Sequence, residues 1–300
     1  VRTGKYLTED KNFFDETPQD ENAVTIDPGM NCTADVVFGW FVKELLYAKE
    51  EDGVLYLDTW QHRAVAVNDE NKLVAKAGSG DCPCKQFTLE VVSSGAERVA
   101  ELAQRADHVI VCAGNQPLIN AREEYDRPDI RLPKAQTALL DAAAAANEST
   151  LLYLVTGYPF AINKEKDTAK AVLCSTHLGP CLGHVAAATV FGENNPAGRT
   201  PTTWYRSVRD LPALDDYDIA KNHVTYLYFR GKPLYAFGYG LSYTTFAYSN
   251  PTVKQENGEV IATINVQNTG ALDGDEVVQL YMSLPSSLRV RPIPVSYTHL

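Results

Sequence analysis

The feature that most constrains the fold is a change in hydrophobic period near residue 94. Apolar residues recur there at spacings of three and four, as on one face of a helix: Val99, Leu102, Ala103 and Ala106. A continuous apolar run at 109–112 follows at once, and the alternation of helix and apolar strand continues to about residue 190. This order is typical of a parallel sheet covered by helices on both faces. We therefore predict an α/β sandwich with a mostly parallel sheet over 94–204.

The first 93 residues have a different pattern, in which short apolar runs alternate with Asp, Asn and Gly turns. Such runs, as at 54–57, 64–67 and 87–92, are typical of strands in an all-β module. Residues 3–10 also resemble residues 62–69, with a basic residue, a strand pattern and an acidic turn in the same order. Repeated hairpins of this kind indicate a partial β-trefoil-like module.

Beyond residue 204 the periodicity is lost over a stretch rich in Tyr, Pro and Gly, which we interpret as a connector over 205–250. Apolar and polar residues then alternate over 260–267, and a second apolar run follows at 277–282. This pattern predicts the start of an antiparallel β-sandwich over 251–300. The sandwich is incomplete, because such a domain usually needs about 100 residues.

The charge of the chain argues against several classes of function. The formal net charge is −11 and the Lys and Arg residues are scattered, so binding to nucleic acid or to anionic membranes is disfavoured. No apolar stretch reaches the roughly 18 residues that a membrane-spanning helix needs. No signal peptide is visible in residues 1–15. Because we expect the chain to begin in mid-domain, the compartment stays open, with a slight preference for the cytoplasm.

The six cysteines predict no metal site. Cys82 and Cys84 lack a second pair of Cys or His residues at zinc-ligand spacing. A chain of this size does not need disulfides for stability, so we interpret the cysteines as buried free thiols. No glycine-rich phosphate-binding loop occurs either. We expect no cofactor.

The candidate site is a long polar segment at 114–132. In open parallel sheets, ligands bind beyond the carboxyl ends of the strands, and the strand at 109–112 ends at this segment. The segment contains a run of charged side chains: Arg122, Glu123, Glu124, Asp126 and Arg127. Adjacent carboxylates disfavour ionisation of one of them, and a neutral carboxyl can protonate a glycosidic oxygen. A merely solvated loop is the alternative interpretation.

The residues of this segment resemble the acid/base loop of glycoside hydrolase family 3, which includes β-glucosidases and β-xylosidases. The match runs from Gly114 to Arg127 and on to Leu132, Pro133 and Gln136. Further motifs follow in the family's order, at 191–203, 237–244 and 268–275. The resemblance places the general acid/base on Glu123. Among the supporting residues, Arg122 and Glu124 flank Glu123, and Asp126 and Arg127 would brace the loop by ion pairing. Glu124 stands where many members have Gly, and so it is a second candidate.

The resemblance also implies a domain order. A (β/α)8 barrel with a nucleophilic Asp is followed in the family by an α/β sandwich and a fibronectin type III-like β-sandwich. Residues 94–204 would be the α/β sandwich, 251–300 part of the fibronectin type III-like domain, and 1–93 part of a fascin-like β-trefoil insert. The N-terminal barrel is not in this chain, which alone is expected to be inactive.

The activity that the resemblance implies is that of a retaining exo-β-glycosidase, similar to a β-glucosidase. It would remove terminal non-reducing sugars from β-linked oligosaccharides or glycosides. A β-xylosidase is the alternative within the family. A non-catalytic carbohydrate-binding or scaffold protein is the alternative of another class, and the sequence leaves an oligomer open.

Overall fold

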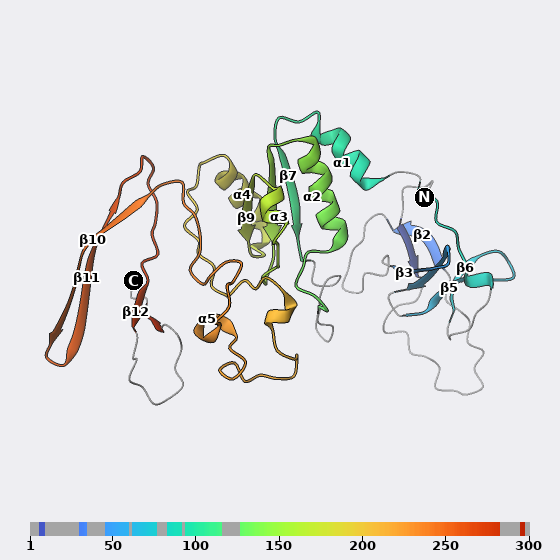
Figure 1. Ribbon diagram of the computed structural model, residues 1–300. Helices are drawn as coiled ribbons and strands as arrows, with labels where there is room; N and C mark the ends of the chain where they lie inside the picture. The colour runs from blue at the N-terminus through green and yellow to red at the C-terminus, as the bar shows by residue number, and fades with distance from the viewer. Residues whose placement is uncertain are drawn as a thin grey trace. The chain divides into compact units, whose positions relative to one another are not determined.

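The computed structural model describes the following residues (Figure 1): 6–9, 30–34, 46–59, 62–76, 83–91, 94–115, 127–282 and 295–297. The chain divides into two compact units. Strands β1 to β6 belong to the first, and Gly95–Asn115 with Arg127–Leu300 form the second. Each unit has its own buried residues.

The first unit is built from antiparallel strands. One sheet contains, in sequence order, β3 (Leu46–Glu51), β4 (Val54–Thr59), β5 (Ala64–Val67) and β6 (Leu73–Lys76), and β1 (Tyr6–Glu9) pairs with β2 (Met30–Ala34). Asp52 and Gly53 join β3 to β4 with φ angles of 49° and 78°, as in the tight turns that match the twist of a hairpin. Val65, Ala66 and Ala75 are buried. The predicted strands at 54–57 and 64–67 are thus confirmed.

Two expectations for this part of the chain were wrong. The run that begins at Phe87 forms an isolated bridge to Leu55 rather than a strand, after the short 3-10 helix η1 (Pro83–Lys85). Cys84 is disulfide-bonded rather than free. In the second unit, Cys112 and Cys181 are free but exposed. An apolar sequence context did not predict burial, because burial depends on which face of an element is covered.

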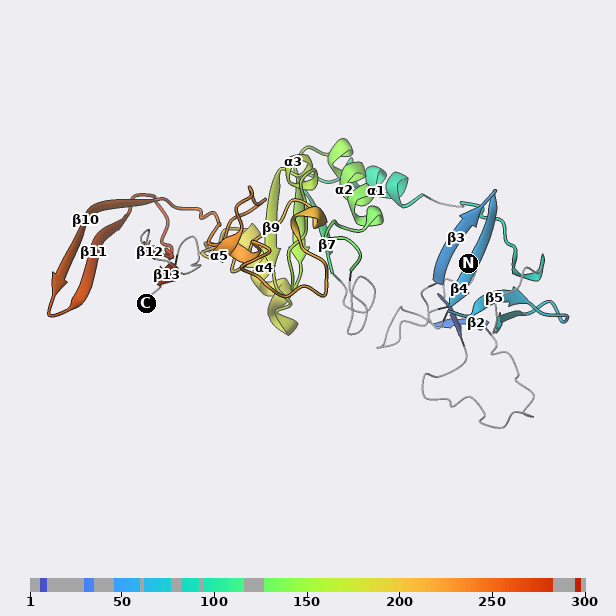
Figure 2. The same cartoon turned by 60° about the horizontal axis from the view of Figure 1, so that its bottom comes forward.

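The second unit contains the predicted parallel sheet. Its elements are α1 (Gly95–Ala103), β7 (Val109–Gly114), α2 (Lys134–Ala146), β8 (Thr150–Val155), α3 (Glu165–Thr168), β9 (Ala171–Ser175), η2 (Gly179–Cys181) and α4 (Leu182–Val190). The strands are parallel in the order β7-β8-β9, with Val109 opposite Thr150 and Leu151 opposite Ala171. α1 and α2 pack side by side next to the sheet (Figures 1 and 2).

The interior of this unit lies between α2 and the sheet. Leu140 on α2 and Leu152 and Leu154 on β8 are fully buried, and Phe160 and Ile162 extend the same cluster beyond the end of β8. The opposite side of β7 is less covered, since Ile110 is 48% exposed. The Asn147 side chain donates to the carbonyls of Ala103 and Ala106, at 3.1 and 2.7 Å, and thereby connects the end of α2 to the end of α1.

The connector and the last strands follow. η3 (Val208–Asp210) and α5 (Thr225–Tyr228) interrupt the connector, and an isolated bridge joins Trp204 to Tyr235. β10 (Phe246–Glu256) and β11 (Glu259–Asn268) form an antiparallel hairpin, and β12 (Leu280–Met282) pairs with β13 (Val295–Tyr297). The alternation predicted for 260–267 is therefore a strand, but Val260 is 70% exposed. Among the described residues, no helix has the length and apolar character needed to cross a bilayer.

Candidate active site

The candidate site is the edge of the sheet at which the parallel strands end. Asn115 follows β7, Gly157 follows β8 and His177 follows β9. The Asn115 side chain is buried, and its Oδ1 accepts a hydrogen bond from the backbone N–H of Gly157 at 2.9 Å. The Nε2 of His177 lies 3.4 Å from the carbonyl oxygen of Asn115. Asn115 is therefore fixed at the carboxyl edge of the sheet, where ligands bind in folds of this type.

The last residue of β7 must be a glycine. Gly114 has a φ of 141°, and a Cβ at this position would lie 1.9 Å from the carbonyl oxygen of Val155. Gln136, in the first turn of α2, accepts from the Gly114 N–H and donates to its C=O, each at 3.0 Å. One side chain thus satisfies both backbone groups at the point where the strand ends.

Replacing Gln136 tests this connection. Gln136→Leu leaves the half-buried N–H and C=O of Gly114 without these partners, so we expect it to lower the free energy of unfolding by about 1–3 kcal/mol. Gln104→Leu is the matched control at an exposed position, where we expect a change within about 0.5 kcal/mol. Denaturant unfolding measures both, and equal effects of the two changes would contradict this role of Gln136.

Arg127 is the first described residue after the polar segment 116–126. Its Nη1 donates to the carbonyl oxygen of Pro159 at 3.2 Å. Its Cζ lies 3.8 Å from the centroid of the Tyr158 ring and 5.1 Å from that of Phe160, so the guanidinium stacks on aromatic faces. Desolvation by burial lowers the pKa of Arg127 below its ordinary value, and burial raises the pKa of Tyr158. A guanidinium nevertheless remains charged at neutral pH.

The other predicted site residues lie outside the described residues. Arg122, Glu123, Glu124 and Asp126 all fall within 116–126, so their roles stay predictions, as does an ion pair between Asp126 and Arg127. The contacts described for Arg127 are instead with the turn after β8, at 158–160. Gly157, Tyr158 and Pro159 were not among the candidate site residues predicted from the sequence. A polar residue directly after an apolar strand, as at 115, was the signal that could have marked the site's first residue.

Residues from the three motifs at 191–203, 237–244 and 268–275 are connected by hydrogen bonds. The Asn195 Oδ1 accepts from the Ser242 hydroxyl at 3.0 Å and from the Tyr243 N–H at 2.8 Å, while its Nδ2 donates to the carbonyl of Asp273 at 2.9 Å. Arg199 forms a 2.8 Å ion pair with Glu276, and both side chains are mostly buried. These residues join the α/β part of the second unit to the start of the last strands, which favours a structural role for them.

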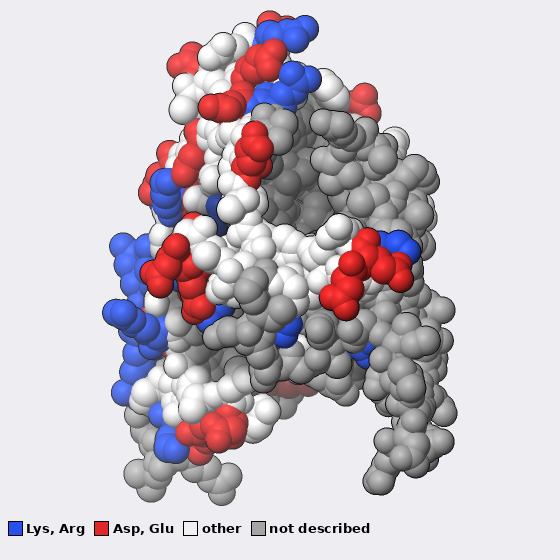
Figure 3. All heavy atoms as spheres, turned by 90° about the vertical axis from the view of Figure 1, so that its right-hand side faces the viewer, with Lys and Arg blue, Asp and Glu red and all other residues white. Residues whose placement is uncertain are grey.

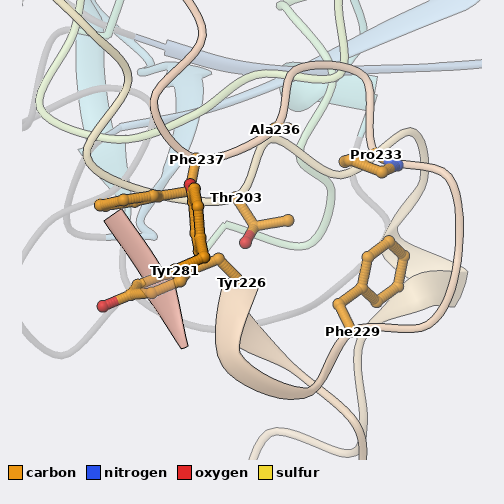
Figure 4. Close-up of a pocket in the computed structure, with 7 residues that line it drawn as sticks. All are labelled: Thr203, Tyr226, Phe229, Pro233, Ala236, Phe237 and Tyr281. Carbon is orange, nitrogen blue, oxygen red and sulfur yellow. The ribbon is translucent and has the colours of Figure 1, made fainter. Parts of the chain in front are cut away.

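A pocket of about 270 Å³ lies in the connector region (Figure 4). It is lined by Thr203, Tyr226, Phe229, Pro233, Ala236, Phe237 and Tyr281. The rings of Tyr226 and Phe237 stack with their centroids 4.1 Å apart and form one wall. None of the strand-end residues lines this pocket. Its aromatic lining offers little of the polar chemistry that acid/base catalysis needs.

The charged surface shows local pairing. On the face in Figure 3, acidic side chains occur in separate groups with Lys and Arg close to several of them. In the first unit, Lys49 pairs with Glu51 at 2.5 Å and Lys72 with Glu70 at 2.7 Å. Exposed pairs of this kind contribute little to stability.

Comparison with known proteins decides the family. Residues 19–243 match the model of the glycosyl hydrolase family 3 C-terminal domain. The chain belongs to glycoside hydrolase family 3. The family predicted from the acid/base loop is thereby confirmed.

The family 3 relatives include both of the expected activities. The chain is 34% identical over 211 residues to a periplasmic β-glucosidase of Salmonella typhimurium, covering 66% of this chain and 28% of that protein. It is 25% identical over 321 residues to a β-xylosidase of Formosa agariphila, covering 94% of this chain and 44% of that protein.

Solved family 3 structures are similar as well. A β-glucosidase of Bifidobacterium adolescentis matches with a TM-score of 0.63 and 29% identity, over 71% of this chain and 34% of that one. A β-glucosidase of Kluyveromyces marxianus in complex with glucose matches with a TM-score of 0.61 and 27% identity, over 71% and 27%. The chain therefore spans less than half the length of these relatives.

Proposed function

We propose that the protein to which this chain belongs is a retaining exo-β-glycosidase of the β-glucosidase type, with Glu123 as its general acid/base. Membership of family 3 is the observation that carries this proposal. The positions of Asn115 and Arg127, the described residues on either side of 116–126, support it, because both lie at the carboxyl edge of the parallel sheet. Functional groups in α/β folds concentrate at that edge.

The proposed reaction needs two carboxyl groups. In a retaining glycosidase they lie about 5–5.5 Å apart, one attacking the anomeric carbon and the other protonating the leaving oxygen. Glu123 would donate that proton and then deprotonate the water that releases the glycosyl-enzyme. The neighbouring carboxylates of Glu124 and Asp126 would favour its protonated form, since like charges disfavour ionisation. The nucleophile would come from the barrel outside these 300 residues, so we expect the chain alone to be inactive.

The domain assignments also belong to the proposal. Residues 1–93 would be part of a fascin-like β-trefoil insert, which the antiparallel strands β3 to β6 support. Residues 94–204 would be the α/β sandwich and 205–250 the connector. Residues 251–300 would be part of a fibronectin type III-like domain, which the long hairpin of β10 and β11 supports.

A β-xylosidase is the second candidate, and the similarity to a β-xylosidase over 94% of this chain favours it. Glucose and xylose differ by a hydroxymethyl group at C5, so the pocket for the terminal sugar decides between them. In this proposal that pocket belongs mostly to the barrel. Both candidates use the same acid/base chemistry.

Product stereochemistry of the full-length protein tests the proposal. We expect hydrolysis of 4-nitrophenyl β-glucoside or β-xyloside to release the β-anomer first, as proton NMR during the first minutes would show, because two inversions at the anomeric carbon retain its configuration. Initial release of the α-anomer would contradict a retaining mechanism. Binding of β-linked oligosaccharides without turnover would instead support the non-catalytic alternative.

A further inference from the structure

The walls of the connector pocket are held together by backbone hydrogen bonds. The N–H of Trp204 donates to the carbonyl of Tyr235 at 3.0 Å, and the N–H of Leu234 donates to the carbonyl of Trp204 at 2.7 Å. The N–H of Gly238 donates to the carbonyl of Thr200 at 2.8 Å. The two segments that carry most of the lining are therefore fixed against each other by the fold, and small-molecule sites are usually formed in advance in this way.

The pocket has the size and the walls of a site for one flat ring. Its volume of about 270 Å³ exceeds the roughly 150 Å³ of an apolar cavity that can hold benzene. Tyr226 and Phe237 stack on one side. Phe229 is held by an edge-to-face contact with Tyr205, with the ring centroids 5.0 Å apart. Aromatic ligands pack favourably against such walls, by stacking or by edge-to-face contact.

One polar atom of the lining has no partner. Thr203 is 6% exposed, and its Oγ1 makes no hydrogen bond among the described residues. The neighbouring Tyr205 hydroxyl does not complete a hydrogen bond with Thr203 and accepts instead from the N–H of Thr225 at 2.6 Å. Figure 4 shows the Thr203 hydroxyl directed into the pocket. Leaving a buried hydroxyl unpaired is costly, so a ligand that pairs with Thr203 gains affinity.

We propose that this pocket is a binding site for a small phenol, that is, a single aromatic ring with one hydroxyl group. The ring packs against the aromatic walls, and its hydroxyl pairs with Oγ1 of Thr203. The hydroxyl of Tyr281 is already partnered, because it donates to Gln279. None of the residues at the strand ends lines the pocket, so this inference goes beyond the proposed function and does not depend on it.

A sugar fits this lining less well than a phenol does. A sugar carries several hydroxyl groups, and each one that enters an apolar site without a hydrogen bond lowers the affinity. Most of the lining consists of aromatic rings, Pro233 and Ala236, whose side chains offer no such bonds. Phenol, toluene and glucose therefore serve as three probes of what the pocket recognises.

Titration of the full-length protein with these probes, followed by ligand-observed NMR, tests the inference. We expect phenol to bind with a dissociation constant on the order of 0.1–1 mM, as a ligand of its size can. Thr203→Val removes the hydroxyl with little change of shape, so it should weaken phenol binding by about tenfold and leave toluene binding unweakened. Thr202→Val makes the same chemical change at an exposed neighbouring position and should alter neither.

A second variant keeps the inference falsifiable if Thr203→Val does not fold. Ala236 lines the pocket from an exposed position, so Ala236→Phe should fill the pocket and abolish this binding of phenol and toluene. Ala213→Phe is the matched control, since Ala213 is exposed and does not line the pocket.

Three results would overturn the inference. The first is that phenol shows no saturable binding below about 10 mM, or binding that neither pocket variant changes. The second is that Thr203→Val weakens phenol and toluene equally, or weakens neither, because the pocket would then not recognise a hydroxyl group. The third is that glucose, and not phenol, binds in a manner that depends on Thr203.

Discussion

Glu123→Gln in the full-length protein is expected to lower kcat/KM by about 100-fold or more on substrates with poor leaving groups, because it removes the proton donor. Gln has nearly the same shape as Glu, so the loss reports the missing proton rather than a changed loop. On dinitrophenyl glycosides, formation of the glycosyl-enzyme should be nearly unaffected, while its hydrolysis slows for lack of a base. Accumulation of the glycosyl-enzyme should then appear as a burst of released phenol followed by slow turnover.

Glu124→Gln is the matched control for this prediction. The two carboxyl groups are adjacent in the sequence, so Glu124 is the second candidate for the acid/base. If Glu123 is the acid/base, Glu124→Gln should change kcat/KM by less than about tenfold, through the charge that it removes beside Glu123. The reverse order of effects would assign the role to Glu124.

Gly114→Ala is expected to have the largest effect on stability. The new Cβ would lie 1.9 Å from the Val155 carbonyl oxygen, and the φ of 141° is one that side-chain-bearing residues rarely adopt. Backbone strain and overpacking together should lower the free energy of unfolding by about 2–5 kcal/mol. The shift should also break the pairing of Gly114 with Gln136 and displace the start of the acid/base loop. We therefore expect activity to fall along with stability.

Gly183→Ala is the matched control for Gly114→Ala. Gly183 lies in the first turn of α4 and has no heavy atom within 4 Å of an added Cβ. Ala favours the helix over Gly, so this change should stabilise the protein by about 0.5–1 kcal/mol. Thermal or denaturant unfolding measures both variants. A Gly114→Ala protein as stable as the parent would show that β7 and β8 do not approach each other as described.

The spacing of apolar residues in the sequence was sufficient to predict the strands and the helix α2 that pack around the interior of the second unit. The parallel strands β7, β8 and β9 are mostly apolar runs, and α2 begins directly after Pro133, a residue type that is favoured at helix starts. The run at 87–92 was wrongly predicted as a strand, because a strand-like sequence does not show whether another strand is available to pair with it. Among the described residues, Phe87 pairs with Leu55 in an isolated bridge.

The carboxylate cluster at 122–126 can be identified in the sequence, and its role, with Glu123 as acid/base, stays a prediction. The contacts of the described residues beside it could not be predicted. The partners of Arg127 at 158–160 and the use of Gln136 to pair with Gly114 arise from tertiary contacts between residues 22 or more positions apart. No periodicity marks such pairs. Their sequence signals, a turn and a helix-start residue, are shared with many residues that have no such role.

Chemical rescue of Glu123→Ala tests the central claim most directly. Removing this side chain leaves the face on which water attacks the glycosyl-enzyme without its base and with room for a small anion. We predict that azide added to the full-length Glu123→Ala protein, with a dinitrophenyl β-glycoside as substrate, restores turnover and yields the β-glycosyl azide. Absence of rescue in a folded variant that is otherwise inactive, or formation of the α-glycosyl azide, would contradict the assignment of Glu123.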